Sequence, residues 1–349
     1  MYTREILAPR ASPIENGSPL QGTWNRAFKD VDLLKIHRPY PCPLPRWIRN
    51  NRIKEWEYFI VQDKHIMLEA FLCNVKLYRM AQVLLYDKEN GKKFIFRKFL
   101  PWGRWQLPHS LANALVESHS LRFFFRIHSW LDADTVRLDL NIAETRSRPS
   151  LTAHLEFNMN SRDSTPMAVS LSLAERRSMY AFKVLTPVRG DVVFGGRHIK
   201  LKQNTCSGIF CDYKGFFPYR LQTTICSAMG FDAKGCRFGF HIAENQTRET
   251  NKNNENVLWV DERLTPLPPV RITMPNGPDS DWIIQDVEGM VDLLFTPKEQ
   301  NRNGTKLIFT SAEFNAPLGY FNGMLVTARE ERIEVRGLLG IGEKLYLRV

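Results

Sequence analysis

The feature that most constrains the fold of this chain is a hydrophobic period of two residues. Apolar and polar side chains alternate strictly over residues 136–142, which read Val-Arg-Leu-Asp-Leu-Asn-Ile. Such alternation is typical of a β-strand with one buried and one solvated face. Short β-branched or aromatic runs recur along the chain and are bounded by turn residues, among which Asn90-Gly91 is a strong hairpin signal.

These runs predict about twenty short strands. We expect them at 56–61, 66–75, 78–86, 93–99, 121–128, 135–142, 151–157, 168–173, 179–185, 192–194, 198–201, 236–242, 257–260, 270–273, 282–287, 290–295, 307–314, 321–328 and 333–339, with a further strand ending at Asp212. A single segment, 109–118 behind Pro108, reads as a helix.

This pattern predicts an all-β protein with very little helix. One closed sheet of so many strands would leave a wide lumen. We therefore expect two antiparallel β-barrels, or strongly curved sheets, packed together. The expected organisation is an extended N-terminal segment over 1–45, an N-terminal barrel over 46–185 and a C-terminal barrel over 186–349.

Composition narrows the protein class. The 349 residues are 43% hydrophobic and 24% charged, which is ordinary for a globular protein. No run approaches the ~18–20 apolar residues of a membrane-spanning helix. Residues 1–20 lack the apolar core of a signal peptide. We therefore expect a cytoplasmic protein whose six cysteines are reduced, buried thiols.

One segment concentrates positive charge. The net charge is +11, and residues 33–54 contain no carboxylate but six cations, with Tyr40 and Trp47 between them: Lys35, Arg38, Arg46, Arg49, Arg52 and Lys54. This pattern could bind phosphate, an anionic lipid or an anionic cofactor. The favoured interpretation is a solvated, proline-broken surface segment. We therefore expect weak retention on heparin and no nucleic acid partner. Peripheral contact with a membrane remains an alternative.

Common catalytic motifs are absent from the sequence. It has no Gly-rich phosphate loop, no GxSxG elbow and no HExxH helix. The eight histidines form no pair at metal-ligand spacing, and the cysteines form no CxxC knuckle. We therefore expect neither a metal nor a cofactor.

Two segments, 208–220 and 239–261, gather polar residues near strand ends, where the pockets of β-barrels form. An Arg and two carboxylates among aromatic residues need partners. We therefore expect five side chains to converge in one cavity, either in the C-terminal half or at the seam between the halves: Asp212, Tyr219, Arg220, Glu255 and Asn256. The alternative is a buried polar network that only fixes strand register.

The order of these segments resembles the family described as domain of unknown function 2804. The resemblance rests on the runs Gly22-Thr23-Trp24-Asn25-Arg26, Lys54-Glu55-Trp56, Asp212 to Arg220, Glu255 to Asp261, Gly323 to Thr327 and Gly337 to Gly340, and so covers nearly the whole chain. It implies a twin lipocalin-like architecture, distantly similar to that of carotenoid hydratases and polyene cyclases.

The sequence departs from that family in two places. Residues 221–226 contain no tryptophan where members carry a Trp-x-Trp stretch, and 247–253 replace a Gly/Asp-rich loop. Any pocket that those tryptophans line is reshaped here, so the substrates of relatives do not transfer directly.

Three functional hypotheses follow. The first is a protein that binds a hydrophobic or amphipathic small molecule, lipid or isoprenoid-like, in a barrel cavity, through Trp56, Tyr213, Tyr219, Arg220, His241, Asn245, Asn256 and Trp259. The second is a cofactor-free hydratase or cyclase, with Asp212 or Glu255 as a buried general acid. A cationic partner would lower the pKa of that acid and argue against the role. The third is polyanion binding through the basic segment.

Overall fold

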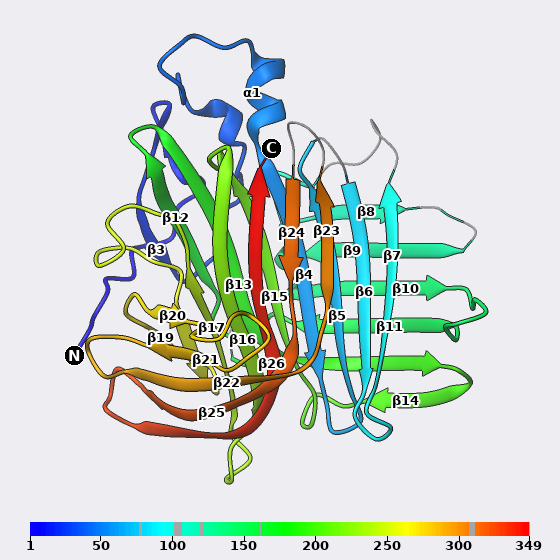
Figure 1. Cartoon of the computed structure of the whole chain (residues 1–349). Coiled ribbons are helices and arrows are strands. Elements are labelled where there is room, and N and C mark those ends of the chain that lie inside the picture. The colour runs from blue at the N-terminus through cyan, green and yellow to red at the C-terminus, as the bar shows by residue number, and fades with distance from the viewer. Residues whose placement is uncertain are drawn as a thin grey trace.

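Two strongly curled antiparallel sheets, each a half-barrel, pack against each other (Figure 1). The computed structural model describes all residues except 77–78, 101–106, 119, 121, 161, 307–310 and 349. Strands make up 58% of the chain and helices 4%, which confirms the all-β prediction. Parts of the expected strands 78–86, 121–128 and 307–314 lie outside the described residues.

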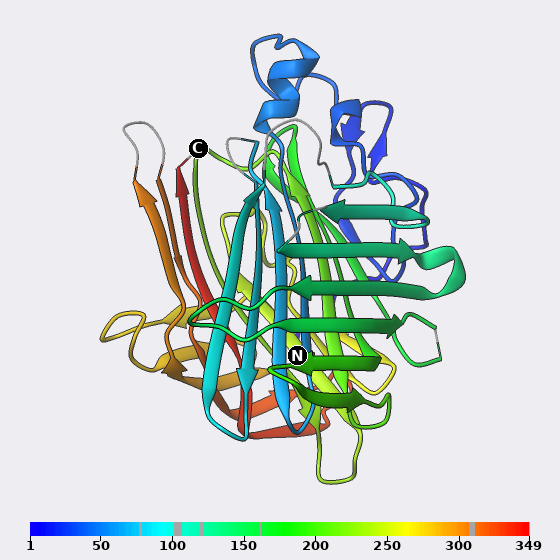
Figure 2. The ribbon, with the colours of Figure 1, turned by 90° about the vertical axis from the view of Figure 1, so that its right-hand side faces the viewer.

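The first sheet has thirteen strands, in the order β7-β6-β5-β4-β15-β13-β11-β10-β9-β8, with β12 and β14 also paired to β13 and β3 paired to β12. Figure 2 shows β8 to β11 running across β5 to β7, so this sheet curls back on itself. The strands are β3 (Gly22–Trp24), β4 (Lys54–Gln62), β5 (Ile66–Asn74), β6 (Arg79–Asp87), β7 (Lys92–Leu100), β8 (Ala114–Ser118), β9 (Phe123–Trp130), β10 (Thr135–Ile142), β11 (Leu151–Asn158), β12 (Met167–Ala174), β13 (Arg177–Phe194), β14 (Arg197–Leu201) and β15 (Ser207–Gly215).

The second sheet has eleven strands, in the order β19-β18-β17-β16-β26-β25-β22-β21-β20, with β24 paired to β23 and β26. They are β16 (Arg220–Phe231), β17 (Arg237–Glu244), β18 (Val257–Val260), β19 (Arg263–Pro266), β20 (Arg271–Thr273), β21 (Trp282–Gln285), β22 (Val291–Glu299), β23 (Arg302–Lys306), β24 (Ser311–Asn315), β25 (Leu318–Val326) and β26 (Arg332–Arg348). The remaining elements are β1 (Ile14–Glu15), β2 (Ser18–Pro19), α1 (Arg46–Arg52) and the 3-10 turns η1 (Leu33–Lys35) and η2 (Leu131–Ala133).

The long strand β13 joins two parts of the first sheet whose strands run in different directions. The first half of β13 pairs with β12 and β15, and its second half pairs with β11 and β14. Gly190, near the change of partners, has φ +146, and a Cβ there would lie 1.9 Å from the carbonyl oxygen of His154. A side chain would therefore block the close approach that lets the sheet curl.

The structure differs from the expected elements in several places. Residues 109–118 form no helix, because 114–118 pair with β9 as strand β8 and bury Val116. The expected strands 179–185 and 192–194 are one strand, β13. The half-polar strand β16 was not predicted. The strand around Asp212 continues to Gly215, and the chain passes from the first sheet to the second over 216–219, later than 186.

The two-residue period separates three apolar cores. One fills the first half-barrel, one lies between the sheets, and one fills the second half-barrel. On β15, Phe210 faces the first of these cores, while Cys211 and Tyr213 face the core between the sheets. Neighbouring residues of a central strand therefore enter different environments.

Candidate functional site

The face of β15 that looks toward the second sheet carries a connected group of buried polar side chains. This seam cluster consists of Tyr58 (β4), Lys183 (β13), Tyr213 (β15), Ser227 (β16), His241 (β17) and Glu255, which precedes β18. Both sheets contribute to it, and all six side chains are buried.

Glu255 is the centre of the seam cluster. Its Oε2 accepts hydrogen bonds from the Lys183 ammonium and, at 2.7 Å, from the Tyr213 hydroxyl. Its Oε1 accepts from the Asn245 amide. Burial alone would raise the pKa of Glu255, but the charge of Lys183, the neighbouring His241 and the hydrogen bond from Lys183 hold the pKa well below its ordinary value. Glu255 is thus kept ionised, which does not suit a proton donor.

The hydrogen bonds continue through His241. Its Nε2 lies 2.9 Å from Tyr213 Oη, and its Nδ1 lies 2.8 Å from Tyr58 Oη and 2.9 Å from Ser227 Oγ. Because the Tyr213 proton goes to Glu255, we infer that Nε2 carries the imidazole proton and Nδ1 accepts one. Burial and the nearby Lys183 lower the pKa of His241 to about 4, so the ring is neutral at pH 7.

The opposite face of the same strands carries a second group, the half-barrel cluster, made of Glu57 (β4), Asp212 and Lys214 (both β15). In the strand register Asp212 stands directly opposite Glu57 on one side and Phe182 on the other. Directly opposed residues of an antiparallel pair have Cβ atoms about 4.5–5.5 Å apart. The two carboxyl groups are therefore neighbours inside the first half-barrel.

The half-barrel cluster lacks internal partners. The carboxyl oxygens of Glu57 and Asp212 and the Nζ atom of Lys214 are buried, and none has a hydrogen-bond partner among the described residues. Burial raises the pKa of Asp212 to about 6, although Lys214 partly offsets this rise. Burial and the neighbouring Asp212 raise the pKa of Glu57 well above its ordinary value. The pair therefore retains a proton far more readily than exposed carboxyls do.

An aromatic shelf lies beside the carboxyl pair. Phe59 and Phe210 stack with ring centroids 4.5 Å apart, Phe182 meets Phe210 at 5.8 Å, and Phe157 meets Phe59 at 5.2 Å. These four side chains are buried and belong to the core of the first half-barrel. The carboxyl pair thus faces an apolar, aromatic interior.

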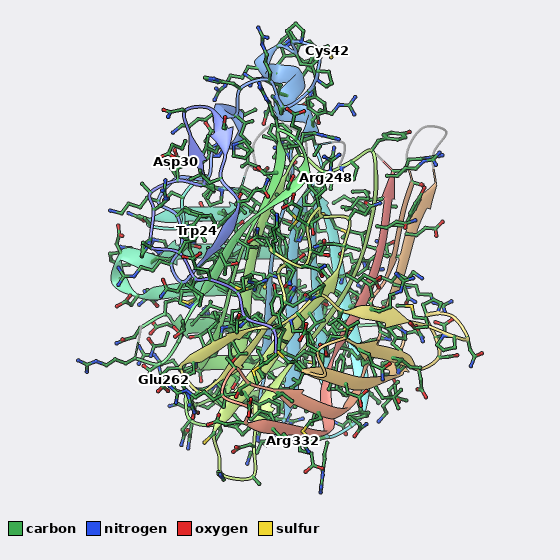
Figure 3. The ribbon with its side chains drawn as sticks, turned by 90° about the vertical axis from the view of Figure 1, so that its left-hand side faces the viewer. Trp24, Asp30, Cys42, Arg248, Glu262 and Arg332 are labelled. Carbon is green, nitrogen blue, oxygen red and sulfur yellow. The ribbon has the colours of Figure 1, made fainter. Side chains whose placement is uncertain are left out.

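Trp24 lies in the same cross-strand row of the sheet as the carboxyl pair. It pairs with Ala168, Ala168 pairs with Phe182, and Phe182 pairs with Asp212, which places the four residues in one row across the strands. Trp24 lies on β3, at the margin of the sheet (Figure 3). Its indole Nε1 is buried and has no partner within the described part of the chain, so this row offers a free donor as well as free acceptors.

A hollow of about 350 Å³ lies against the core of the first half-barrel. Its walls include Phe28, Met159, Phe182 and Val184. Phe182 also belongs to the aromatic shelf, and its direct register partner is Asp212. A volume of this size falls within the range of small-molecule sites.

The residues expected from sequence divide into three groups. Glu255, Tyr213, His241 and Asn245 meet in the seam cluster, and Trp56 stacks on Tyr213 with ring centroids 5.2 Å apart. Asp212 lies on the other face of β15. The rest stand apart: Tyr219 and Arg220 are exposed, Asn256 bonds the backbone of Ala243 and Pro268, and Trp259 donates to the Thr165 carbonyl.

The expectation that Asp212, Tyr219, Arg220, Glu255 and Asn256 share one cavity is therefore wrong. Asp212 is interior to β15, where alternation directs it away from the seam. The cation beside Glu255 is Lys183, not Arg220.

Sequence reasoning missed Glu57, Lys183 and Lys214. Glu57 and Lys183 are charged residues inside runs of otherwise apolar or aromatic strand residues, Trp56-Glu57-Tyr58-Phe59 and Phe182-Lys183-Val184. Because a buried charge is costly unless it is partnered, a lone charge in such a run is a usable signal of a buried polar site.

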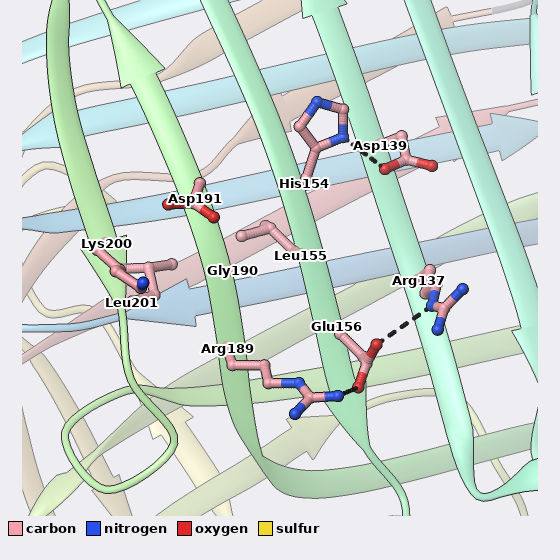
Figure 4. Close-up of a pocket in the computed structure, with 10 residues that line it drawn as sticks. All are labelled: Arg137, Asp139, His154, Leu155, Glu156, Arg189, Gly190, Asp191, Lys200 and Leu201. Atoms are coloured by element: carbon pink, nitrogen blue, oxygen red, sulfur yellow. Dashed lines mark hydrogen bonds and ion pairs between the residues drawn. The ribbon is translucent and has the colours of Figure 1, made fainter.

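A third set of charged residues lies on the outer surface of the first sheet. Figure 4 shows a shallow hollow over β10, β11, β13 and β14, where Arg137 and Arg189 both bind Glu156, and His154 binds Asp139. These exposed pairs satisfy one another, and exposed pairs contribute little. In the described ranges no group of three or more His, Cys, Asp or Glu residues is arranged to hold a metal ion, and no helix there is long and apolar enough to cross a membrane.

Comparison with known proteins identifies the family. The model of the family described as Domain of unknown function (DUF2804) matches residues 4–348. The chain belongs to this family. The DUF2804 chain has no match among curated proteins.

Solved structures similar to this DUF2804 protein have low sequence identity to it. Kievitone hydratase from Nectria haematococca is 8% identical, covering 84% of this chain and 88% of its own, with a TM-score of 0.44. An AttH-like protein from Nitrosomonas europaea is 13% identical, covering 87% and 96%, with a TM-score of 0.46.

Proposed function

We propose that the protein binds a hydrophobic or amphipathic small molecule inside the first half-barrel and transfers a proton to it from the Glu57–Asp212 pair, as a cofactor-free hydratase or cyclase. The observation that carries this proposal is a pair of buried carboxyl groups that have no hydrogen-bond partner and face an aromatic interior. Native proteins seldom leave such groups unsatisfied without a functional reason.

The chemistry needs only the proton that the pair retains. The protonated carboxyl gives its proton to one carbon of a substrate double bond, and a cation forms on the other carbon. Addition of water to that cation and return of a proton to the carboxylate completes a hydration. Attack by a second double bond followed by the same proton return completes a cyclisation. The proton belongs to the pair rather than to either residue.

The surroundings suit such a cationic intermediate. The faces of aromatic rings attract cations, and Phe59, Phe182 and Phe210 lie next to the pair. Both carboxyl groups are buried, so a substrate bound beside them would be shielded from water. The free indole N–H of Trp24 would hold an oxygen atom of an amphipathic substrate.

The seam cluster supports a structural role instead. Glu255 is ionised beside Lys183, and the ring nitrogens of His241 both have partners. This cluster joins the two sheets and offers no carboxylic acid proton. The binding residues expected on that face, Trp56, Tyr213 and His241, are mutually packed or hydrogen-bonded.

The test begins with native mass spectrometry of protein purified from cells, to detect a co-purifying apolar molecule. That molecule is then incubated with the protein in D₂O, and products are analysed for deuterium. We expect incorporation with the wild type and its loss, by at least about 100-fold, in Asp212→Asn and Glu57→Gln.

Glu69→Gln is the matched control, since Glu69 is also a buried carboxyl without hydrogen-bond partners but lies on β5 facing the seam. We expect Glu69→Gln to keep the activity. An Asp212→Asn variant that turns over as fast as the wild type would contradict the proposed acid. A bound ligand that incorporates no deuterium would contradict catalysis and support binding as the only function.

A further inference from the structure

The segment from η1 to α1 forms a knob at one end of the molecule. Figure 1 shows α1 standing beyond the ends of the strands, and Figure 3 shows Cys42 at its tip. The knob is a fixed structure: Leu33, Leu34 and Ile36 pack with Ile53 and Phe216 in a small core of their own. The expected proline-broken surface segment therefore contains an ordered helix.

Arg49 fastens the helix to the rest of the knob. Its guanidinium donates to the carbonyl oxygens of Ile36, at 2.9 Å, and Leu34, at 3.4 Å. The knob can thus present its outer side chains in a defined arrangement.

The outer side of α1 carries an unusually exposed aromatic residue. The Trp47 side chain is 67% exposed, more than any other aromatic side chain among the described residues. Leu44 and Ile48 beside it are half-buried. Exposing an indole to water is unfavourable, and tryptophan is enriched where one side of a surface is apolar and the other wet.

Cations are concentrated on the knob. Two surface hollows on the knob are lined by Lys35, His37, Arg38, Arg46, Arg49 and Arg176, and no Asp or Glu lines either one. Lys35 binds Asp30, and Arg46 lies 3.4 Å from Asp32. Within the described part of the chain, Arg38, Arg52 and Arg176 have no carboxylate at ion-pair distance.

We propose that this knob docks on an anionic phospholipid surface, with Trp47 in the interface and Arg38, Arg52 and Arg176 at the headgroup phosphates. Charge complementarity and an exposed indole at the same tip favour a membrane over a nucleic acid, which would need a longer basic stripe along the molecule. The proposal stands on the knob alone and does not depend on chemistry inside the half-barrel.

Binding is measured by co-sedimentation with vesicles of phosphatidylcholine, and with vesicles in which phosphatidylserine replaces a third of it. We expect binding to the anionic vesicles and little binding to the neutral ones. Each arginine lost should weaken binding about five-fold, so Arg38→Gln/Arg52→Gln should weaken it about 25-fold. Trp47→Ala should weaken it further.

The control variants remove two cations and one indole from surfaces outside the knob. Lys200→Gln/Lys202→Gln removes two exposed cations at β14, and Trp130→Ala removes an indole that is 41% exposed. Both should bind as the wild type does. Equal binding to neutral and anionic vesicles, no binding at all, or equal losses in the controls would overturn the proposal. Tighter binding to a DNA duplex that Trp47→Ala leaves unchanged would assign the patch to nucleic acid instead.

Discussion

Asp212 and Tyr213 are neighbours in β15, yet they belong to two buried polar clusters with opposite properties. The seam cluster around Tyr213 pairs its carboxylate with a lysine and gives each imidazole nitrogen a partner. The half-barrel cluster around Asp212 leaves its carboxyl and ammonium groups without hydrogen bonds. A complete set of partners fixes how two sheets meet, whereas an incomplete set is available to a ligand.

The largest expected effect is in the seam cluster. Lys183→Met would leave the Glu255 carboxylate buried without its cation, so we expect a loss of about 3–5 kcal/mol in the free energy of unfolding. Urea denaturation at pH 7 measures it. Lys214→Met is the matched control, because Lys214 is equally buried but makes no hydrogen bond. An equal loss in both variants would erase the distinction between the clusters.

The next effect has the opposite sign. Asp212→Asn should increase the free energy of unfolding by about 1–3 kcal/mol at pH 7, since burial raises the pKa of Asp212 to about 6 and its ionised form is costly there. The folded state holds this proton more tightly than the unfolded chain. The wild type should therefore lose stability relative to Asp212→Asn as the pH rises from about 4 to about 6.

Denaturation curves of the two proteins at pH 4, 5, 6 and 7 give this difference. A variant less stable than the wild type across the whole range would mean that Asp212 is satisfied, as Glu255 is. Glu255→Gln, which removes a paired carboxylate, should by contrast destabilise the protein.

The effect of His241 on stability should depend on pH in the opposite way from that of Asp212, because stability is lost as the pH falls. Its pKa is lowered to about 4, so below pH 6.5 the unfolded chain binds a proton that the folded protein does not. We expect His241 to cost about 1–2 kcal/mol of stability at pH 5. Imidazole nitrogen shifts measured by NMR should show a neutral ring with its proton on Nε2 from pH 7 to pH 5. A ring that titrates near pH 6.5 would contradict the seam geometry.

The smallest effect tests redundancy in the seam. Tyr58→Phe removes one hydroxyl from His241 Nδ1, but Ser227 lies 2.9 Å from the same atom. We expect a loss of about 0.5–1 kcal/mol, at the low end for a buried hydrogen bond. Thermal unfolding of Tyr58→Phe, Ser227→Ala and the double variant measures it, and the double variant should lose more than the sum of the two single ones. Strict additivity would show that the two hydroxyls act independently.

The sequence predicted strands far better than it predicted the site. Alternation is local, so the strands and the fold class followed from runs such as 136–142. The prediction was wrong about the sheet face on which Asp212 lies, because the strand was expected to end at that residue. Alternation continued through Gly215 would have placed Asp212 and Tyr213 on opposite faces. The pairing of Asp212 with Glu57 depends on which distant strands become neighbours, and no short segment carries that information.

That pairing has a consequence for how the protein is made. Strand β15 lies between β4 and β13 in the first sheet, although the chain reaches it only after all the other strands of that sheet. Until residues 207–215 leave the ribosome, β4 and β13 have exposed edges in the middle of the sheet, where another chain could add. Contacts so distant in sequence also form slowly. A nascent chain should therefore depend on chaperones until β15 is inserted, and a fragment that stops before Ser207 should aggregate instead of forming a half-barrel.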